Sequence, residues 1–197
     1  MNLKHLGDAL DHWKGSLFDY LREEKVLHDF AVDPMDSDQE QWKKTDFAIY
    51  RRLLRIDENQ LIRHKSTLAD DRNQYFSEIK LITGDLFLDP DTGILTSKVN
   101  KKDEKKYIKP HEVASLLQDD RLLAVYQHVR GKVVSERVGK CLDAIKQKTS
   151  SFSCCSYESG MAAMLFLSHQ PDRTTKVKEA LTRLLGKHTK RIVLSRR

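Results

Sequence analysis

The sequence has 197 residues, of which 39% are hydrophobic and 32% are charged. This balance is typical of a soluble globular domain and excludes a disordered or fibrous chain. The formal net charge of +6 is a modest excess, which is compatible with a nucleic-acid partner but does not require one.

Three sequence features predict a cytoplasmic protein with no membrane partner. The longest apolar stretch, residues 161–167, is too short to span a bilayer. The N-terminal segment 1–13 carries scattered charges and lacks the apolar core of a signal peptide or anchor. Cys154 and Cys155 are adjacent, so on a strand they point to opposite faces and suit neither a disulfide framework nor a metal clamp. We expect buried thiols in a reducing compartment.

The first half of the chain predicts three helices and two strands. Apolar residues repeat every three or four positions between Leu3 and Leu21, as in an amphipathic helix. The first strand should end at Asp33-Pro34, where proline stops the ladder. The predicted elements are helices 3–21, 45–54 and 70–79 and strands 26–32 and 61–62.

The second half alternates short apolar runs with amphipathic segments. Residues 85–89 form an apolar run that ends at a proline and a glycine, as expected of a buried central strand. Glu158-Ser159-Gly160 separates the last two apolar runs and predicts an antiparallel hairpin. The predicted elements are strands 85–89, 122–126, 152–157, 161–167 and 192–194 and helices 110–117, 135–146 and 174–185.

This alternation predicts one α/β domain over residues 1–197. We expect three layers, with helices on both faces of a mostly parallel sheet and the C-terminal hairpin as an antiparallel edge.

Polar residues follow three of the predicted strands, and such strand ends are where open α/β sheets bind ligands. They are Asp33 with Asp36, then Asp89 with Asp91, then Gln127 with His128 and nearby Arg130. We therefore predict one site that brings these strand ends together.

The chemistry of this site has alternatives at each position. Asp89 and Asp91 flank a proline, and with Asp33 they provide the oxygen ligands that Mg²⁺ or Mn²⁺ prefers beside a phosphate. The same carboxylates suit a sugar hydroxyl or an amino group, and Asp-Pro-Asp-Thr-Gly is also ordinary turn chemistry. His128 suits general acid/base catalysis or a structural role. Glu78-Ile79-Lys80 has the acid-x-lysine spacing of metal-dependent nucleases.

Basic residues lie beside the predicted site and at the C-terminus. The loop 98–106, beginning at Lys98, and the tail 187–197 carry much of the positive charge. Such runs are either solvated or bind a phosphate backbone. The sequence contains no GxxxxGK[ST], GxGxxG, GxSxG or HExxH motif, so we do not expect nucleotide binding through a glycine-rich loop.

The runs GDLFLDPDTG, KYIKPHEV and LLAVYQHVR resemble a bacterial family of uncharacterised proteins with a D-P-D-[TN]-G motif and a Y-Q-H strand. More distantly, this half resembles Rossmann-like S-adenosylmethionine methyltransferases that act on adenine in ribosomal RNA, with Asp89-Pro90-Asp91 in place of D-P-P-[YF]. The stretch from Asp11 to Lys14 is similar to their N-terminal segment. The resemblance implies a Rossmann-like fold and a role for Asp89 in accepting a hydrogen bond from an amino group. Thr92 stands in place of their stacking aromatic.

Three functional classes remain open. The first is a metal-dependent enzyme acting on phosphate esters or nucleic acid, with Asp33, Asp89 and Asp91 as metal ligands and His128 as acid/base. The second is a methyltransferase-like protein that uses S-adenosylmethionine, and the third is a non-catalytic binding module. The carboxylates favour the first, because residues 26–36 lack the glycine-rich turn of a cofactor site. The substrate-binding residues predicted with them are Lys14, Lys98, Gln127 and Arg130.

Overall fold

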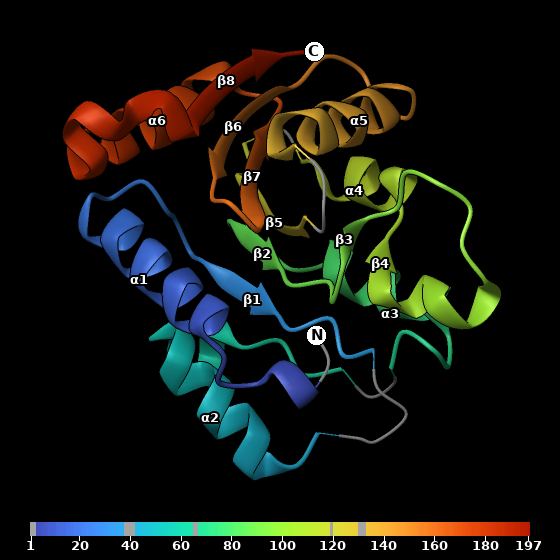
Figure 1. The fold of residues 1–197 in the computed structure, drawn as a ribbon. Coiled ribbons are helices and arrows are strands. Elements are labelled where there is room, and N and C mark those ends of the chain that lie inside the picture. The colour runs from blue at the N-terminus through green and yellow to red at the C-terminus, as the bar shows by residue number, and fades with distance from the viewer. Residues whose placement is uncertain (1–2, 38–41, 65–66, 119, 130–132) are drawn as a thin grey trace.

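The computed structural model describes residues 3–37, 42–64, 67–118, 120–129 and 133–197. Its helices are α1 (Ala9–Glu23), α2 (Lys44–Leu54), α3 (Arg72–Lys80), α4 (Pro110–Leu116), α5 (Val134–Lys146) and α6 (Pro171–Leu185), as Figure 1 shows. Four 3₁₀ helices are η1 (Leu3–His5), η2 (Glu58–Gln60), η3 (Lys101–Lys106) and η4 (Gly186–Arg191). The strands are β1 (Ala31–Asp33), β2 (Leu86–Leu88), β3 (Gly93–Ile94), β4 (Tyr107–Ile108), β5 (Leu123–His128), β6 (Ser153–Glu158), β7 (Ala162–Ser168) and β8 (Ile192–Arg196).

Six strands form one mixed sheet in the order β1-β2-β5-β7-β6-β8, and β3 pairs with β4 separately. The β1–β2 and β2–β5 pairs are parallel, whereas β5–β7, β7–β6 and β6–β8 are antiparallel. Consequently β1, β2, β5 and β6 run in one direction, and β7 and β8 run in the other. The α/β class predicted from the sequence is confirmed, but the prediction of a mostly parallel sheet is wrong.

The position of β7 also differs from the sequence prediction. We expected the last two apolar runs to form the antiparallel edge of the sheet. Instead, β7 lies inside the sheet, between β5 and β6, and β8 forms the edge. Central placement agrees with the composition of β7, because every residue of Ala162–Ser168 is buried.

Two apolar clusters lie on the two faces of the sheet, because successive strand residues point to opposite sides. Leu86 and Leu88 of β2 pack in the cluster that contains the buried faces of α3, α4 and α5. Phe87, between them, packs with the buried faces of α1, α2 and α6. Figure 1 shows these two sets of helices on either side of the strands.

Helix α1 begins at Ala9, later than the leucine spacing predicted. Gly7 has a φ of 91°, which breaks the helix, and the Asp8 carboxylate caps the new N-terminus by accepting from the backbone N–H groups of Leu10 and Asp11. Gly15 then permits a close approach to α2, since a Cβ there would overlap the carbonyl oxygen of Leu53. This packing brings the polar residues of α1 and α2 to the same strand end.

Within the part of the chain that the structure describes, no helix is both long enough and apolar enough to cross a membrane.

Candidate functional site

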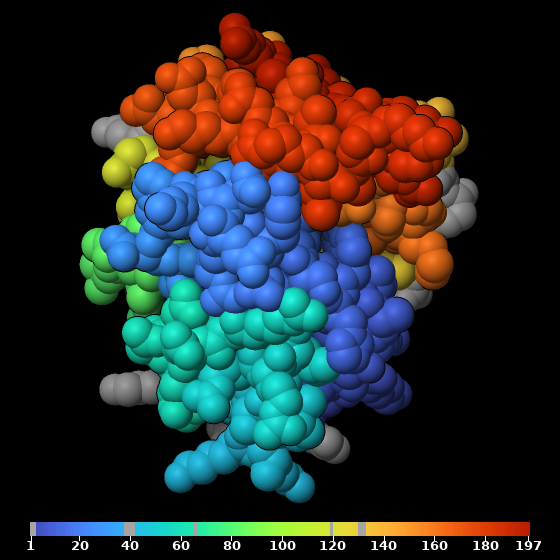
Figure 2. All heavy atoms as spheres, turned by 90° about the vertical axis from the view of Figure 1, so that its left-hand side faces the viewer, coloured from blue at the N-terminus to red at the C-terminus, as the bar shows by residue number. Residues whose placement is uncertain are grey.

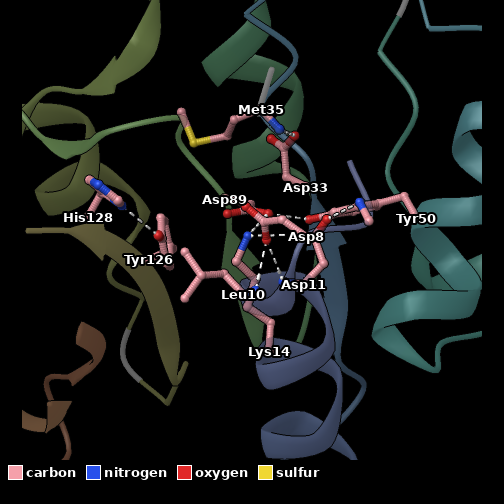
Figure 3. A network of polar contacts seen from close by, with 11 residues as sticks. Asp8, Leu10, Asp11, Lys14, Asp33, Met35, Tyr50, Asp89, Tyr126 and His128 are labelled. Atoms are coloured by element: carbon pink, nitrogen blue, oxygen red, sulfur yellow. Dashed lines mark hydrogen bonds and ion pairs between the residues drawn. The ribbon is translucent and has the colours of Figure 1, made fainter. Parts of the chain in front are cut away.

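A buried polar network surrounds Asp89, the residue that follows β2. Its Oδ2 atom accepts hydrogen bonds from Lys14 Nζ and from Tyr50 Oη, each at 2.8 Å. Lys14 also donates to Asp11 Oδ1 at 3.0 Å. We call these four side chains the Asp89 network. Figure 3 shows that α1, α2 and the end of β2 contribute them.

The charges of the Asp89 network are held away from solvent. Lys14 is only 3% exposed, and burial alone would lower its pKa. The charges of Asp89 and Asp11 outweigh burial and raise the pKa of Lys14 above its ordinary value, so this lysine stays protonated. Burial raises the pKa of Asp11, and Lys14 opposes that rise. The Lys14 ammonium also lies 4.4 Å from the centroid of the Tyr126 ring, a cation–π contact.

Asp33 belongs to a different network, on the other face of the sheet. Its Oδ1 accepts from Tyr75 Oη at 2.6 Å and from the backbone N–H of Met35 at 2.8 Å. Its Oδ2 lies 3.2 Å from His64 Nε2, and His64 Nδ1 lies 3.3 Å from Glu78 Oε2. The His64 ring therefore stands between the carboxylates of Asp33 and Glu78.

The predicted metal set of Asp33, Asp89 and Asp91 is not assembled in this structure. Asp33 pairs in register with Leu88, so Asp89 lies one residue further and its side chain points to the opposite face. Among the described residues, no three Asp, Glu, His or Cys side chains are grouped so that they could hold a metal ion.

Asp89, Asp91 and His128 line one small cavity of about 50 Å³. Asp8 and Tyr126 also line it, and Tyr126 Oη lies 3.0 Å from His128 Nδ1. The strand ends of β2 and β5 thus bring together three of the predicted site residues.

A larger pocket of about 480 Å³ shares lining residues with the small cavity. We call it the strand-end pocket. His5, Asp91 and His128 line both spaces. The other lining residues are Thr92, Ser97, Val99, Asp103, Lys106, Tyr107, Val129 and Arg137.

Gln127 holds the loop that forms one wall of the strand-end pocket. Its Oε1 accepts from the backbone N–H of Ile94 at 2.8 Å, and its Nε2 donates to the carbonyl oxygens of Thr92 and His128. Gly93 has a φ of 116°, and a Cβ there would overlap the Gln127 amide. Gln127 was predicted to bind substrate, but it is fully buried and its observed contacts position the loop.

Arg137, near the start of α5, brings positive charge to the strand-end pocket. Its guanidinium donates to the Thr96 hydroxyl and, at 2.7 Å, to the carbonyl oxygen of Ile94. Both acceptors are neutral, and Arg137 forms no ion pair with any residue that the structure describes. Lys106, which also lines the pocket, is paired with Asp103 at 2.8 Å.

The remaining predicted substrate-binding residues lie elsewhere. Lys98 is exposed, between two residues that line the pocket, Ser97 and Val99. Lys14 lies inside the Asp89 network and is almost inaccessible. Arg130 falls outside the described residues.

The turn after β1 does not fit S-adenosylmethionine. In a Rossmann-like cofactor site this turn lets the backbone approach the ligand through glycine. Here Met35 occupies the turn with a φ of 48° and a fully buried side chain. The Asp33 carboxylate, also fully buried, is occupied by Tyr75 and Met35.

Sequence reasoning missed several residues of the site. Tyr50 lies in the helix predicted over residues 45–54, but no local pattern signals a polar role for its hydroxyl. Arg137 and His5 reach the pocket from elements far from Asp89 in sequence, and no motif marks them. The one available signal was Asp8 after Gly7, a typical helix start.

Comparison with known proteins adds no family to this geometry. No protein-family model matches the chain, and no curated protein matches it in sequence. The resemblances drawn from GDLFLDPDTG and its neighbouring runs therefore stay predictions.

Proposed function

We propose that the protein binds a nucleotide, or a nucleotide residue of a larger substrate, in the strand-end pocket. The observation that carries the proposal is the division of charge along one continuous space. Asp89 and Asp91 lie at one end, Arg137 lies at the other, and His128 lines both the small cavity and the pocket.

Each end suits a different part of a nucleotide. An Arg guanidinium without a carboxylate partner favours a phosphate, to which it can donate two hydrogen bonds. Carboxylates in the small cavity favour N–H or O–H donors, such as an exocyclic amino group or a sugar hydroxyl. We further propose that the His128 imidazole takes up the proton that leaves the amino or hydroxyl group held by Asp89 and Asp91, and that contact with Tyr126 orients its ring.

The order of elements supports a Rossmann-like, three-layer fold as part of this proposal. Asp89-Pro90-Asp91 is followed by β3, η3 and β4, and then by α4, β5, α5 and the antiparallel pair β6–β7. The methyltransferases that this half resembles have the same order from the helix onward after their D-P-P-[YF] strand. The likeness favours chemistry at an amino group over phosphate-ester hydrolysis.

Calorimetric titration of the purified protein with AMP, CMP, UMP, adenosine and inorganic phosphate tests the proposal. We expect AMP and CMP to bind more tightly than UMP, which lacks an amino group, and more tightly than adenosine or phosphate alone. Arg137→Gln should weaken AMP binding about tenfold or more, as expected for loss of a charge-assisted contact of roughly 1.5–3 kcal/mol.

One further variant separates the charge of Arg137 from its structural hydrogen bonds, and a second serves as a control. Arg137→Lys keeps the charge and should retain most of the preference for AMP over adenosine. Arg52→Gln removes an exposed arginine from α2 and should leave binding unchanged. Equal binding of AMP and adenosine by the wild-type protein would refute the phosphate assignment.

A further inference from the structure

The net positive charge of the protein resides in its last 27 residues. Residues 171–197 contain nine Lys and Arg and two acidic residues, which gives +7, whereas the whole chain carries +6. The preceding 170 residues therefore carry −1 in total. These last residues form α6, η4 and β8, drawn in orange and red in Figure 1 and covering the upper part of the face in Figure 2.

Most of these cations are not neutralised by the fold. Arg173, Arg183 and Arg197 pair with Asp85, Glu24 and Asp143. The other six are exposed and form no ion pair in the part of the chain that the structure describes. They are Lys176, Lys178, Lys187, Lys190, Arg191 and Arg196.

Topology places η4 at the same edge of the sheet as the strand-end pocket. Strand β6 runs in the direction of β5, so Glu158, its last residue, lies at the edge where His128 ends β5. Arg191 of η4 donates to the carbonyl oxygen of Glu158 at 3.3 Å. The start of β8, Ile192, pairs with Tyr157.

The separation between the pocket and η4 is short. Tyr126 pairs with Met164, Met164 pairs with Tyr157, and Tyr157 pairs with Ile192. Three strand spacings of about 4.8 Å place Ile192 roughly 14 Å from Tyr126. A bound segment of a few nucleotides spans this distance, since single-strand sites cover about 4–16 nucleotides.

Partly exposed aromatic and apolar side chains lie between the strand-end pocket and η4. Trp13 of α1 and Tyr157 of β6 have ring centroids 5.6 Å apart, and both are partly exposed. Met161, directly before β7, is 63% exposed. Cations beside aromatic rings are the pattern expected where bases stack and phosphates bind.

We propose that the cations of η4 and α6 hold the phosphate backbone of a single-stranded polynucleotide whose end residue enters the strand-end pocket. The inference rests on the proposed function and specifies its substrate class. A single strand is favoured over a duplex, because a nucleotide can enter the pocket only when it is unstacked. The aromatic pair and the continuity with the pocket favour a polynucleotide over an anionic membrane.

Fluorescence anisotropy with labelled 12-residue oligoadenylate and oligocytidylate, whose bases carry the amino group that the pocket should prefer, tests this surface in the full-length protein. The triple variant Lys187→Gln, Lys190→Gln, Arg191→Gln should bind at least tenfold more weakly. The slope of log K against log salt should fall by about 2, since each lost cation removes about 0.7 for a single strand. The control triple Lys43→Gln, Lys44→Gln, Arg52→Gln removes three exposed cations from α2 and its start, and should change affinity less than twofold.

The outcomes separate the two proposals. If the η4 variant and the control lose affinity equally, or if vesicles containing phosphatidylserine bind and oligonucleotides do not, the surface proposal is overturned while AMP binding can persist. If oligonucleotides bind through η4 but AMP neither binds nor competes, the assignment of the pocket and the path into it both fail. The proposal predicts unchanged AMP affinity in the η4 variant.

Discussion

Two buried aspartates at opposite ends of β2 show how partners decide the role of the same residue type. Asp85 precedes the strand and Asp89 follows it, and each is only 1% exposed. Asp85 accepts from the backbone N–H groups of His28 and Leu122 and from Arg173, at 2.5–2.8 Å. The partners of Asp89 are side chains of two helices, and it also lines a cavity.

The pockets at the amino and carboxyl edges of the sheet differ in the same way as Asp85 and Asp89. A pocket of about 520 Å³ at the amino ends of β1 and β2 is similar in volume to the strand-end pocket, at about 480 Å³. Its charged lining residues are Asp29 and Asp57, and no cation lines it among the described residues. Volume therefore does not distinguish the two pockets, whereas their lining does: charges of both signs and two histidines, His5 and His128, line the strand-end pocket. The contacts of Asp85 are those of a structural link, and we propose that Asp89 serves the site.

The largest effect should come from Lys14→Met, which leaves Asp89 and Asp11 buried without their cation. We expect a loss of about 3–5 kcal/mol in the free energy of unfolding at pH 7.5, as for other broken buried ion pairs. Urea denaturation measures it, with Lys44→Met on the exposed start of α2 as control.

The loss in the free energy of unfolding caused by Lys14→Met should depend on pH. Because the pKa of Asp11 is already raised in the folded state, its carboxyl stabilises the fold below the unfolded pKa and loses that contribution as the pH rises through the folded pKa. Removing Lys14 raises the folded pKa further, so the deficit should shrink as the pH falls from 7.5 towards 4.5. A deficit independent of pH would show that the lost charge pair is not its cause.

Asp85→Asn should cost about 3 kcal/mol, because it removes the charge of a buried carboxylate and leaves the partly buried Arg173 without a charged partner. AMP affinity, measured where the variant is fully folded, should stay within twofold of wild type. Asp172→Asn, on the exposed start of α6, is the matched control. Loss of AMP binding in Asp85→Asn alone would remove the distinction between the two ends of β2.

Gly93→Ala should destabilise the fold by roughly 1–3 kcal/mol through its positive φ, with a further cost from overlap with Gln127. Because this loop forms a wall of the strand-end pocket, AMP binding should fall as well. Gly139→Ala, where a Cβ meets no neighbouring atom, should have neither effect. Normal AMP affinity in Gly93→Ala would mean that the loop does not shape the site.

The smallest expected effect concerns His64. Burial lowers its pKa, but bonding and charge from Asp33 and Glu78 outweigh burial, so the pKa is raised above 6.5. Its stabilising contribution is therefore complete below pH 6.5 and is lost as the pH rises through the folded pKa. Urea midpoints between pH 5.5 and 8.5 should show this decline in wild type and a smaller one in His64→Gln. If the urea midpoints of wild type and His64→Gln declined in parallel with pH, the stabilising contribution of His64 would be contradicted.

The sequence predicted the strand ends better than the contacts made there. Asp89 and His128 were found because apolar runs bounded by Pro90 and by polar residues locate buried strands and their exits. The bonds from Lys14 and Tyr50 join residues 75 and 39 positions from Asp89, so no local pattern reveals them. The three carboxylates of the predicted metal set are not grouped for a related reason: a one-residue offset between β1 and β2 sends Asp33 and Asp89 to opposite faces, and register is not visible in a single strand.

Backbone amide chemical shifts, followed by NMR during titration with AMP, test the central claim most directly. The account predicts that the perturbed amides cluster at the carboxyl ends of β2 and β5, including Thr92, Tyr107 and His128. It predicts no change at Asp29, Asp57 and Thr83, which line the pocket at the opposite edge. Perturbations confined to that opposite edge, or none at millimolar AMP, would contradict the assignment of the strand-end pocket as the functional site.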